Sequence, residues 1–269
     1  MLRALRQELP RQDFIYLADQ AHVPYGPRSL EQVRDFSREI TRFLLDQGAS
    51  LIVVACNAAS AAALHHLRQT FPTTSFVGME PAVKPAAEHT HSGVVGVLAT
   101  PATFQGALYA SVVERFASGV ELLQSTCPGL VGQIEGGRLD TPKTRCILQH
   151  ALAPMLERGI DTIVIGCTHY PFVIPLIQEI AGAGVRVIDP APAVARQARR
   201  LLELSGRLAA EPGRARFLTS GAPGRLERLL PRLIQTSAPV ERVKWTRGEP
   251  GQLGSWNIKI IDSREPLNK

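Results

Sequence analysis

The sequence has few cysteines and no long hydrophobic run, and each shortage excludes a class of protein. Four cysteines in 269 residues are too few for a disulfide scaffold. No apolar run approaches the roughly 18 to 20 residues that a helix needs to cross a bilayer. The first eight residues also lack the uninterrupted apolar core of a signal peptide. We therefore expect a cytoplasmic protein with reduced thiols and no membrane partner.

Metal-binding patterns are missing as well. The sequence has no Cys-x-x-Cys and no His-x-x-x-His pair, and no cluster of carboxylates surrounds a cysteine. We therefore expect neither a metal ion nor another cofactor.

The charge is unbalanced in one region only. The net charge is +6, and residues 196–247 hold twelve Arg or Lys against four Glu. Such a cluster can attract phosphate polymers or acidic small molecules. No zinc motif or stacking aromatic accompanies it, so we interpret the region as a solvated helical face.

Short β-branched runs alternate with helical patterns along the chain, which predicts an α/β fold with mostly parallel sheets flanked by helices. The length favours two modest domains. A helix is expected from Ser29, where Gln32 completes a capping box, to the stop at Gly48. An alanine-rich helix is expected over about 58–70. Strands are expected at 51–55, 94–98, 120–123, 162–165, 185–188 and 216–218.

One pattern occurs twice. Residues 50–57 and 161–168 each read as a buried strand, a small residue, a cysteine and a polar residue that opens a helix. We interpret this as one βα unit used once in each of two similar lobes.

Proline pairs indicate where the chain changes lobe. The first lobe is expected to comprise residues 1–80 and 189–246, and the second residues 81–188. Residues 247–269 are rich in Gly and Pro and are expected to form a loosely ordered tail.

Cys56 and Cys167 are the candidate catalytic residues. The pattern puts both at the carboxyl ends of parallel strands, where helix N-termini bring a partial positive charge. Such a site lowers the pKa of a thiol from about 8.5, and His169 is close in sequence to Cys167. Burial behind the strands is the alternative, since free cysteine is often buried. We interpret Cys127 and Cys146 as structural.

Two thiols that face one crevice from opposite lobes favour one type of reaction. One thiolate removes a proton from carbon, and the other thiol delivers a proton to the opposite face. The result is inversion of a stereocentre, with the carbanion charge stabilised by amide donors and helix N-termini.

These residues resemble glutamate racemase, of the cofactor-independent aspartate/glutamate racemase superfamily, over roughly residues 2 to 235. The most specific match is the run Gly-Cys-Thr-His-Tyr-Pro at 166–171. The other matching stretches are 16–19, 24–26, 53–60, 96–100, 135–136 and 217–221.

The resemblance implies two α/β lobes with the active site in the cleft between them. Cys56 would serve D-glutamate and Cys167 L-glutamate, with His169 and Glu135 supporting Cys167. Substrate-binding residues would be Pro24, Tyr25, Gly26, Asn57, Ala58, Thr100, Thr168 and His169. The residues alone also allow a plain turn at 24–26, a helix cap at Asn57 and a solvated acid at Glu135.

The implied activity is racemisation of glutamate without a cofactor, which supplies D-glutamate for peptidoglycan. The expected partners are glutamate and a second copy of the chain in a homodimer. One alternative is a racemase for aspartate or another amino acid. Another is a catalytically silent binding protein that acts through its arginine-rich helices. Association with nucleic acid or DNA gyrase has no support beyond the basic region.

The chain departs from the family in two places. The family begins with a strand and an Asp-Ser-Gly sequence, whereas Met1–Arg6 resembles the helix that follows them. A misplaced start codon or a natural truncation would explain this, and we expect residues 1–269 to fold less stably than a complete relative and to racemise slowly or not at all. Ala58 stands where the family usually has threonine, at a cost of about 1.5 to 3 kcal/mol in substrate binding.

Overall fold

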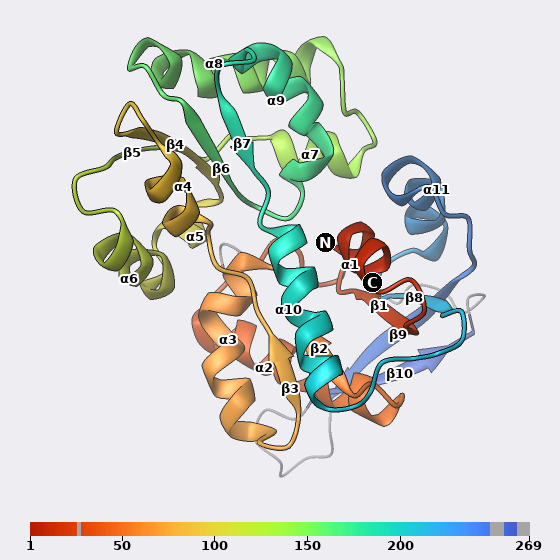
Figure 1. Ribbon diagram of the computed structural model, residues 1–269. Helices are drawn as coiled ribbons and strands as arrows, with labels where there is room; N and C mark the ends of the chain where they lie inside the picture. Colours follow the sequence, from red (N-terminus) through yellow and green to blue (C-terminus); the bar gives the residue numbers. More distant parts are fainter. Residues whose placement is uncertain (26–27, 248–255, 263–269) are drawn as a thin grey trace. The chain divides into compact units, whose positions relative to one another are not determined.

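The computed structural model describes residues 1–25, 28–247 and 256–262 (Figure 1). Contacts divide the chain into two compact units. Unit 1 comprises Met1–Val54, Ala62–Val77 and Val194–Lys269, and unit 2 comprises Ala55–Ala61 and Gly78–Ala193. Among the described residues, no helix combines the length and apolar character that crossing a membrane requires.

The observed division differs from the expected one around Cys56. We expected all of 1–80 in the first lobe, but Ala55–Ala61 belongs to unit 2. The physical reason is local, because the side chain of Asn57 is hydrogen-bonded to Gly166 in the same unit.

Unit 1 contains a four-stranded sheet with the order β1-β8-β9-β10. Strands β1 (Phe14–Ala18), β8 (Ala215–Thr219) and β9 (Val240–Arg247) are parallel neighbours. β10 (Trp256–Ile261) runs antiparallel to β9. The expectation of a loose tail over 247–269 is therefore wrong at β10, where alternating apolar and polar side chains accompany a continuous ladder.

Helices pack on opposite faces of this sheet, because successive side chains of a strand point to opposite faces. Phe217 of β8 packs under α11 (Pro223–Ile234). The next residue, Leu218, packs with Phe43 of α2 (Leu30–Asp46).

The expected start and end of α2 are confirmed. The Ser29 hydroxyl accepts a hydrogen bond from the Gln32 N–H, and the Gln32 side chain accepts one from the Ser29 N–H. After the helix, Gly48 adopts a left-handed φ of 88°, a conformation that favours glycine.

A second sheet of unit 1 pairs β2 (Leu51–Val53) with β3 (Ser75–Val77) in parallel. They are joined by α3 (Asn57–Thr70), the expected alanine-rich helix. Unit 1 therefore has two sheets, whereas the sequence pattern predicts one mostly parallel sheet in each lobe. Two further helices precede strands of the first sheet in the chain: α1 (Leu2–Glu8) comes before β1, and α10 (Ala191–Leu204) comes before β8.

Unit 2 contains one parallel sheet with the order β5-β4-β6-β7. Its strands are β4 (Val94–Ala99), β5 (Glu121–Ser125), β6 (Thr162–Gly166) and β7 (Arg186–Ile188). All five residues of β6 are buried. The four strands expected in this part of the sequence are confirmed, with shifts of one or two residues at their ends.

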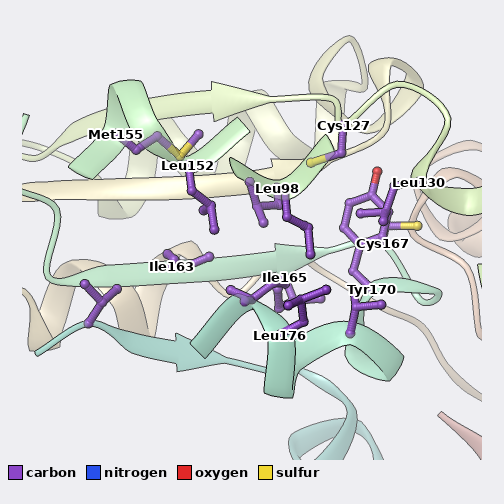
Figure 2. Packing of buried hydrophobic residues seen from close by; sticks show 14 of the residues in the cluster. Leu98, Cys127, Leu130, Leu152, Met155, Ile163, Ile165, Cys167, Tyr170 and Leu176 are labelled. Atoms are coloured by element: carbon purple, nitrogen blue, oxygen red, sulfur yellow. The ribbon is translucent and has the colours of Figure 1, made fainter. Parts of the chain in front are cut away.

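Helices cover both faces of the unit 2 sheet. Val164 of β6 belongs to one core, whereas Ile163 and Ile165 belong to the other. Figure 2 shows Leu152 and Met155 packed toward the strands in the second core. The first core is covered by α4 (Val83–His89), α5 (Pro101–Phe104) and α6 (Ala107–Phe116), and the second by α7 (Leu130–Glu135), α8 (Pro142–Glu157), η1 (Tyr170–Val173) and α9 (Ile174–Ala181).

Several arginines of the basic region are paired with carboxylates of unit 1. Arg216 donates two hydrogen bonds of 3.0 Å to Glu241, and Arg199 donates one of 2.7 Å to Glu203. The pair of Arg199 on α10 (Ala191–Leu204) fits the interpretation as a solvated helical face. That interpretation is wrong for Arg216, which lies on strand β8, and for Arg242, which is buried on β9. Binding to nucleic acid stays without further support.

Candidate active site

The two candidate cysteines follow strand ends, as the sequence predicts. The predicted helix start at Thr168 is wrong, because a turn follows Cys167 and the short 3-10 helix η1 begins only at Tyr170. Cys167 directly follows β6, and Cys56 immediately precedes Asn57, the first residue of α3. The side-chain amide of Asn57 donates a hydrogen bond of 2.9 Å to the main-chain carbonyl of Gly166. The residues adjacent to the two cysteines are therefore in direct contact within unit 2.

Close packing of two strands fixes the end of β6. Gly166 pairs with Ala99 of β4, and a Cβ added at Gly166 would lie 2.7 Å from the Cβ of Ala99. Thr100 follows Ala99 at the same edge, and its Oγ1 lies 3.1 Å from that of Thr103. Thr100 therefore lies at the sheet edge that carries Cys167.

The thiol of Cys56 is stabilised in its protonated form. Burial raises its pKa, and the nearby charge of Cys167 raises it further. Main-chain N–H groups of Ala59 and Ala58 partly oppose this effect by hydrogen bonding to the sulfur. The protonated thiol is therefore the favoured form of Cys56 at neutral pH.

Cys167 is connected to a carboxylate through a histidine. The Cys167 Sγ lies 3.8 Å from Nδ1 of His169, and Nε2 of His169 lies 3.2 Å from Oε1 of Glu135. Burial lowers the pKa of His169, but hydrogen bonds to Cys167 and Glu135 outweigh burial and raise that pKa to about 9. At neutral pH an imidazolium therefore lies between the sulfur and the carboxylate.

Two buried residues pack beside Cys167. The hydroxyl of Tyr170 donates a hydrogen bond of 3.1 Å to the carbonyl of Thr126. Burial raises the pKa of Cys127 to about 11, and its side chain belongs to the core shown in Figure 2. These observations fit the structural interpretation of Cys127.

Cys146 is exposed, in contrast to Cys127, and its interpretation as structural stays a prediction. Its side chain is exposed on α8, and its Sγ lies 3.4 Å from Nδ1 of His150. The helical pattern around Cys146 does not reveal that this position faces outward.

The structure brings most of the predicted site residues into unit 2. They are Cys56, Asn57, Ala58, Thr100, Glu135, Cys167, Thr168 and His169. Pro24 and Tyr25 belong to unit 1, and Gly26 lies outside the described residues.

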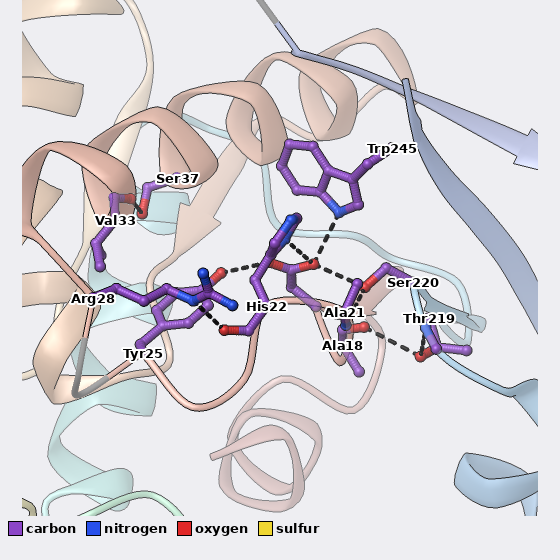
Figure 3. A network of polar contacts seen from close by, with 12 residues as sticks. Ala18, Ala21, His22, Tyr25, Arg28, Val33, Ser37, Thr219, Ser220 and Trp245 are labelled. Carbon is purple, nitrogen blue, oxygen red and sulfur yellow. Dashed lines mark hydrogen bonds and ion pairs between the residues drawn. The ribbon is translucent and has the colours of Figure 1, made fainter. Parts of the chain in front are cut away.

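Sequence reasoning missed a polar network in unit 1. Asp19 is buried and accepts hydrogen bonds from side chains that include Tyr25, Ser220 and Trp245 (Figure 3). Its members are up to 226 positions apart in the sequence, so no local pattern could have indicated it.

Acid/base side chains at the carboxyl edge of an open parallel sheet define a class of protein. They are typical of α/β enzymes that bind small molecules at this edge and move protons there. In the described part of the chain, no three His, Cys, Asp or Glu side chains are grouped so that they could hold a metal ion.

Comparisons with known proteins narrow this class. A family profile described as Asp/Glu/Hydantoin racemase matches residues 1–198. The chain is 50% identical over 232 residues to a glutamate racemase of Pseudomonas aeruginosa. This alignment covers 86% of this chain and 88% of the relative.

Solved structures agree with these matches. The glutamate racemase of Escherichia coli, in complex with L-glutamate and the activator UDP-MurNAc-ala, aligns with a TM-score of 0.78 and 30% identity. The alignment covers 90% of this chain and 92% of that one. The glutamate racemase of Thermus thermophilus, in complex with beta-chloro-D-alanine, aligns with a TM-score of 0.76 and 36% identity over 90% of this chain and 91% of that one.

The chain belongs to the Asp/Glu/Hydantoin racemase family. It is therefore an isomerase of the racemase type.

Proposed function

We propose that the chain interconverts L- and D-glutamate with Cys56 and Cys167 as the two acid/base groups. The observation that carries the proposal is the hydrogen bond between Asn57 and Gly166, because it holds the residues next to both thiols together. Glutamate is the proposed substrate because the relatives are glutamate racemases and the Escherichia coli protein binds L-glutamate.

The two thiols have different resting roles in this proposal. The Sγ of Cys167 lies 3.8 Å from Nδ1 of His169, and we assign Cys167 the role of the base for L-glutamate. Its thiolate takes the proton from Cα of L-glutamate, and the thiol of Cys56 gives its proton to the opposite face of Cα. One C–H bond breaks and another forms, and the negative charge moves from Cys167 to Cys56. The same steps in reverse convert D-glutamate.

Local donors and one acceptor fit an amino-acid substrate. The N-terminus of α3 directs main-chain N–H groups toward negative charge, which suits the carbanion or a carboxylate. The Oδ1 of Asn57 is buried and has no hydrogen-bond partner among the described residues. A buried oxygen without a partner is costly, and we assign it the substrate ammonium as its donor.

Other residues complete the proposed binding site. Thr100, Thr168 and Ala58 are the further proposed substrate-binding residues of unit 2, and substrate binding by Pro24, Tyr25 and Gly26 stays a prediction. The biological role that follows is supply of D-glutamate for peptidoglycan. The expected homodimer stays a prediction.

The test is exchange of the Cα hydrogen in deuterium oxide. Wild-type protein should incorporate deuterium into the product enantiomer, because the delivering thiol exchanges with solvent. Cys56→Ser should exchange L-glutamate without inverting it, and Cys167→Ser should do the same for D-glutamate. Cys146→Ser is the matched control, because it removes an exposed thiol, and it should keep wild-type activity.

Retention of protium in both enantiomers would contradict the proposal. Faster racemisation of aspartate than of glutamate would favour the alternative substrate, which the alanine at position 58 keeps open. Absence of both activities, together with salt-sensitive binding of a polyanion, would favour a binding protein.

A further inference from the structure

Asp19 is a buried carboxylate with four side-chain donors from three separate segments of unit 1. His22 Nδ1 and the Tyr25 hydroxyl each lie 2.8 Å from Oδ2. The Ser220 hydroxyl and the Trp245 indole N–H donate to Oδ1 at 2.8 and 2.9 Å. The carboxylate thus connects the segment after β1, the segment after β8, and β9 (Figure 3).

Aromatic rings enclose this network. The imidazole of His22 stacks on Phe36 with ring centroids 3.9 Å apart, and the ring of Trp245 meets it edge-on at 4.7 Å. The main-chain carbonyl of His22 also accepts a hydrogen bond of 2.5 Å from Nε of Arg28. His22 is therefore held by Phe36, Trp245 and Arg28 as well as by Asp19.

The network keeps the carboxylate charged in spite of burial. Burial raises the pKa of Asp19, but hydrogen bonds and charge from His22, with further hydrogen bonds from Ser220 and Tyr25, lower it below its ordinary value. Apolar residues would often serve stability as well as a buried charge does. The carboxylate instead fixes the orientation of the side chains around it, since each donor must point at one of its two oxygens.

The direction that matters is that of Tyr25. Its hydroxyl reaches Asp19 across six positions of the chain, and the Ala21 N–H is held by the Ser220 hydroxyl at 3.0 Å. Tyr25 is therefore attached to Asp19, and Ala21 to Ser220. The side chains of Asp19 and Ser220 are in turn hydrogen-bonded to each other. Loss of the carboxylate would remove the hydrogen bonds of Tyr25 and Trp245 to residue 19, and would leave the hydrogen bond between Ala21 and Ser220 as the contact to the residue after β8.

We propose that Asp19 is a positioning residue that fixes the conformation of residues 19–25, the segment to which the proposed function assigns the substrate contacts of Pro24 and Tyr25. It acts through this segment and does not touch the substrate. This inference rests on the proposed function for its effect on glutamate, and on the network alone for its effect on the segment.

The test compares Asp19→Asn with a matched control, Asp161→Asn. Asp161 is also a carboxylate with four donors, but it lies before β6, at the strand end opposite Cys167. Asp19→Asn turns an amide NH₂ toward groups that donate. We expect it to raise KM for glutamate at least tenfold with kcat changed less than threefold. Asp161→Asn should lower the melting temperature without changing KM.

A second measurement does not depend on activity. Trypsin cleavage after Arg28 should be at least tenfold faster in folded Asp19→Asn than in wild type, and unchanged in Asp161→Asn. If Asp19→Asn does not fold, Trp245→Phe and Ser220→Ala each remove one donor and should show smaller changes of the same sign.

The outcomes separate the two proposals. Wild-type protein without racemase activity contradicts the proposed function, and cleavage after Arg28 still decides whether Asp19 holds the segment. Active wild-type protein with unchanged KM in the folded Asp19 variants overturns this inference alone, as does unchanged cleavage after Arg28.

Discussion

The side chain of Asn57 donates a hydrogen bond to the carbonyl of Gly166, and each of these residues is the chain neighbour of a cysteine. The two cysteines lie 111 positions apart in the sequence. The hydrogen bond is buried and joins the start of α3 to the end of β6. It is therefore a structural contact that holds the two thiol-bearing turns together.

Removal of this contact should impair activity more than stability. Asn57→Ala leaves the buried carbonyl of Gly166 without this donor, at a cost of about 1 to 3 kcal/mol in the free energy of unfolding. It also removes the oxygen that we assign to the substrate ammonium. We expect kcat/KM for glutamate to fall at least 100-fold, measured beside urea unfolding.

Ser60→Ala is the control for Asn57→Ala. Ser60 lies in the same helix as Asn57, and its hydroxyl accepts a hydrogen bond of 2.9 Å from the N–H of Met79. The variant should lose a similar amount of stability and keep most of the activity. Equal activity of the two variants would mean that the Asn57 contact is only structural.

The pH dependence of the L-to-D reaction should follow His169. Its pKa is raised from 6.5 to about 9, so the imidazolium and its stabilising contacts are fully present below about pH 6.5 and are lost as the pH rises through about 9. We expect kcat/KM for L-glutamate to fall above pH 9. Glu135→Gln should move both the rate inflection and the NMR titration of the His169 ring to lower pH.

Glu179→Gln tests whether any lost carboxylate has this effect. Glu179 is exposed and pairs with Arg145, so the His169 titration should not move. An unchanged titration in Glu135→Gln would show that Glu135 does not hold the imidazolium.

Gly166 should tolerate no side chain. The Cβ of an alanine would lie 2.7 Å from the Cβ of Ala99 and 3.2 Å from the carbonyl oxygen of Leu98, which are parts of a buried strand. We expect Gly166→Ala to lose about 1 to 3 kcal/mol of stability and most activity, because Cys167 is displaced with the strand end.

Gly96→Ala provides the comparison for Gly166→Ala. Its added Cβ meets Sδ of Met155 at 2.9 Å, and a flexible thioether adapts more readily than a strand. Gly96→Ala should therefore lose less free energy of unfolding in denaturant than Gly166→Ala, and it should keep its activity. The reverse order of the two losses would contradict this argument.

The sequence predicts the parts of this structure that depend on local patterns. The buried β-branched runs give β4 and β6, and Ser29 with Gln32 gives the start of α2. The strand-cysteine-helix repeat gives the locations of Cys56 and Cys167. Each of these signals lies within about ten residues, so hydrophobic periodicity and capping chemistry suffice to find it.

The parts that were not predicted depend on distant partners. β10 is a strand because it pairs with β9, and its surroundings of Gly and Pro obscure the alternation. The placement of Ala55–Ala61 in unit 2 depends on the contact between Asn57 and Gly166. Asp19 has an ordinary local context, and only the fold brings Ser220 and Trp245 to it.

Asp161 should make unit 2 sensitive to acid. Burial raises its pKa, but the N–H groups of Ser92 and His91 and the hydroxyls of Thr90 and Thr162 lower that pKa from 3.8 to about 2. Because the folded-state pKa is depressed, the stabilisation is present above about pH 4 and is lost as the pH falls toward 2.

We expect Asp161→Asn to lower stability by about 1 kcal/mol at pH 7, a value reduced for solvent screening. The difference from wild type should vanish near pH 2, as followed by urea unfolding across this range. Asp13→Asn is the comparison, because Asp13 accepts a single main-chain hydrogen bond of 2.7 Å from Arg214. This substitution should therefore lower the free energy of unfolding at pH 7 by less than Asp161→Asn does. A pH-independent loss in Asp161→Asn would mean that packing, and not the charge of the carboxylate, stabilises the turn before β6.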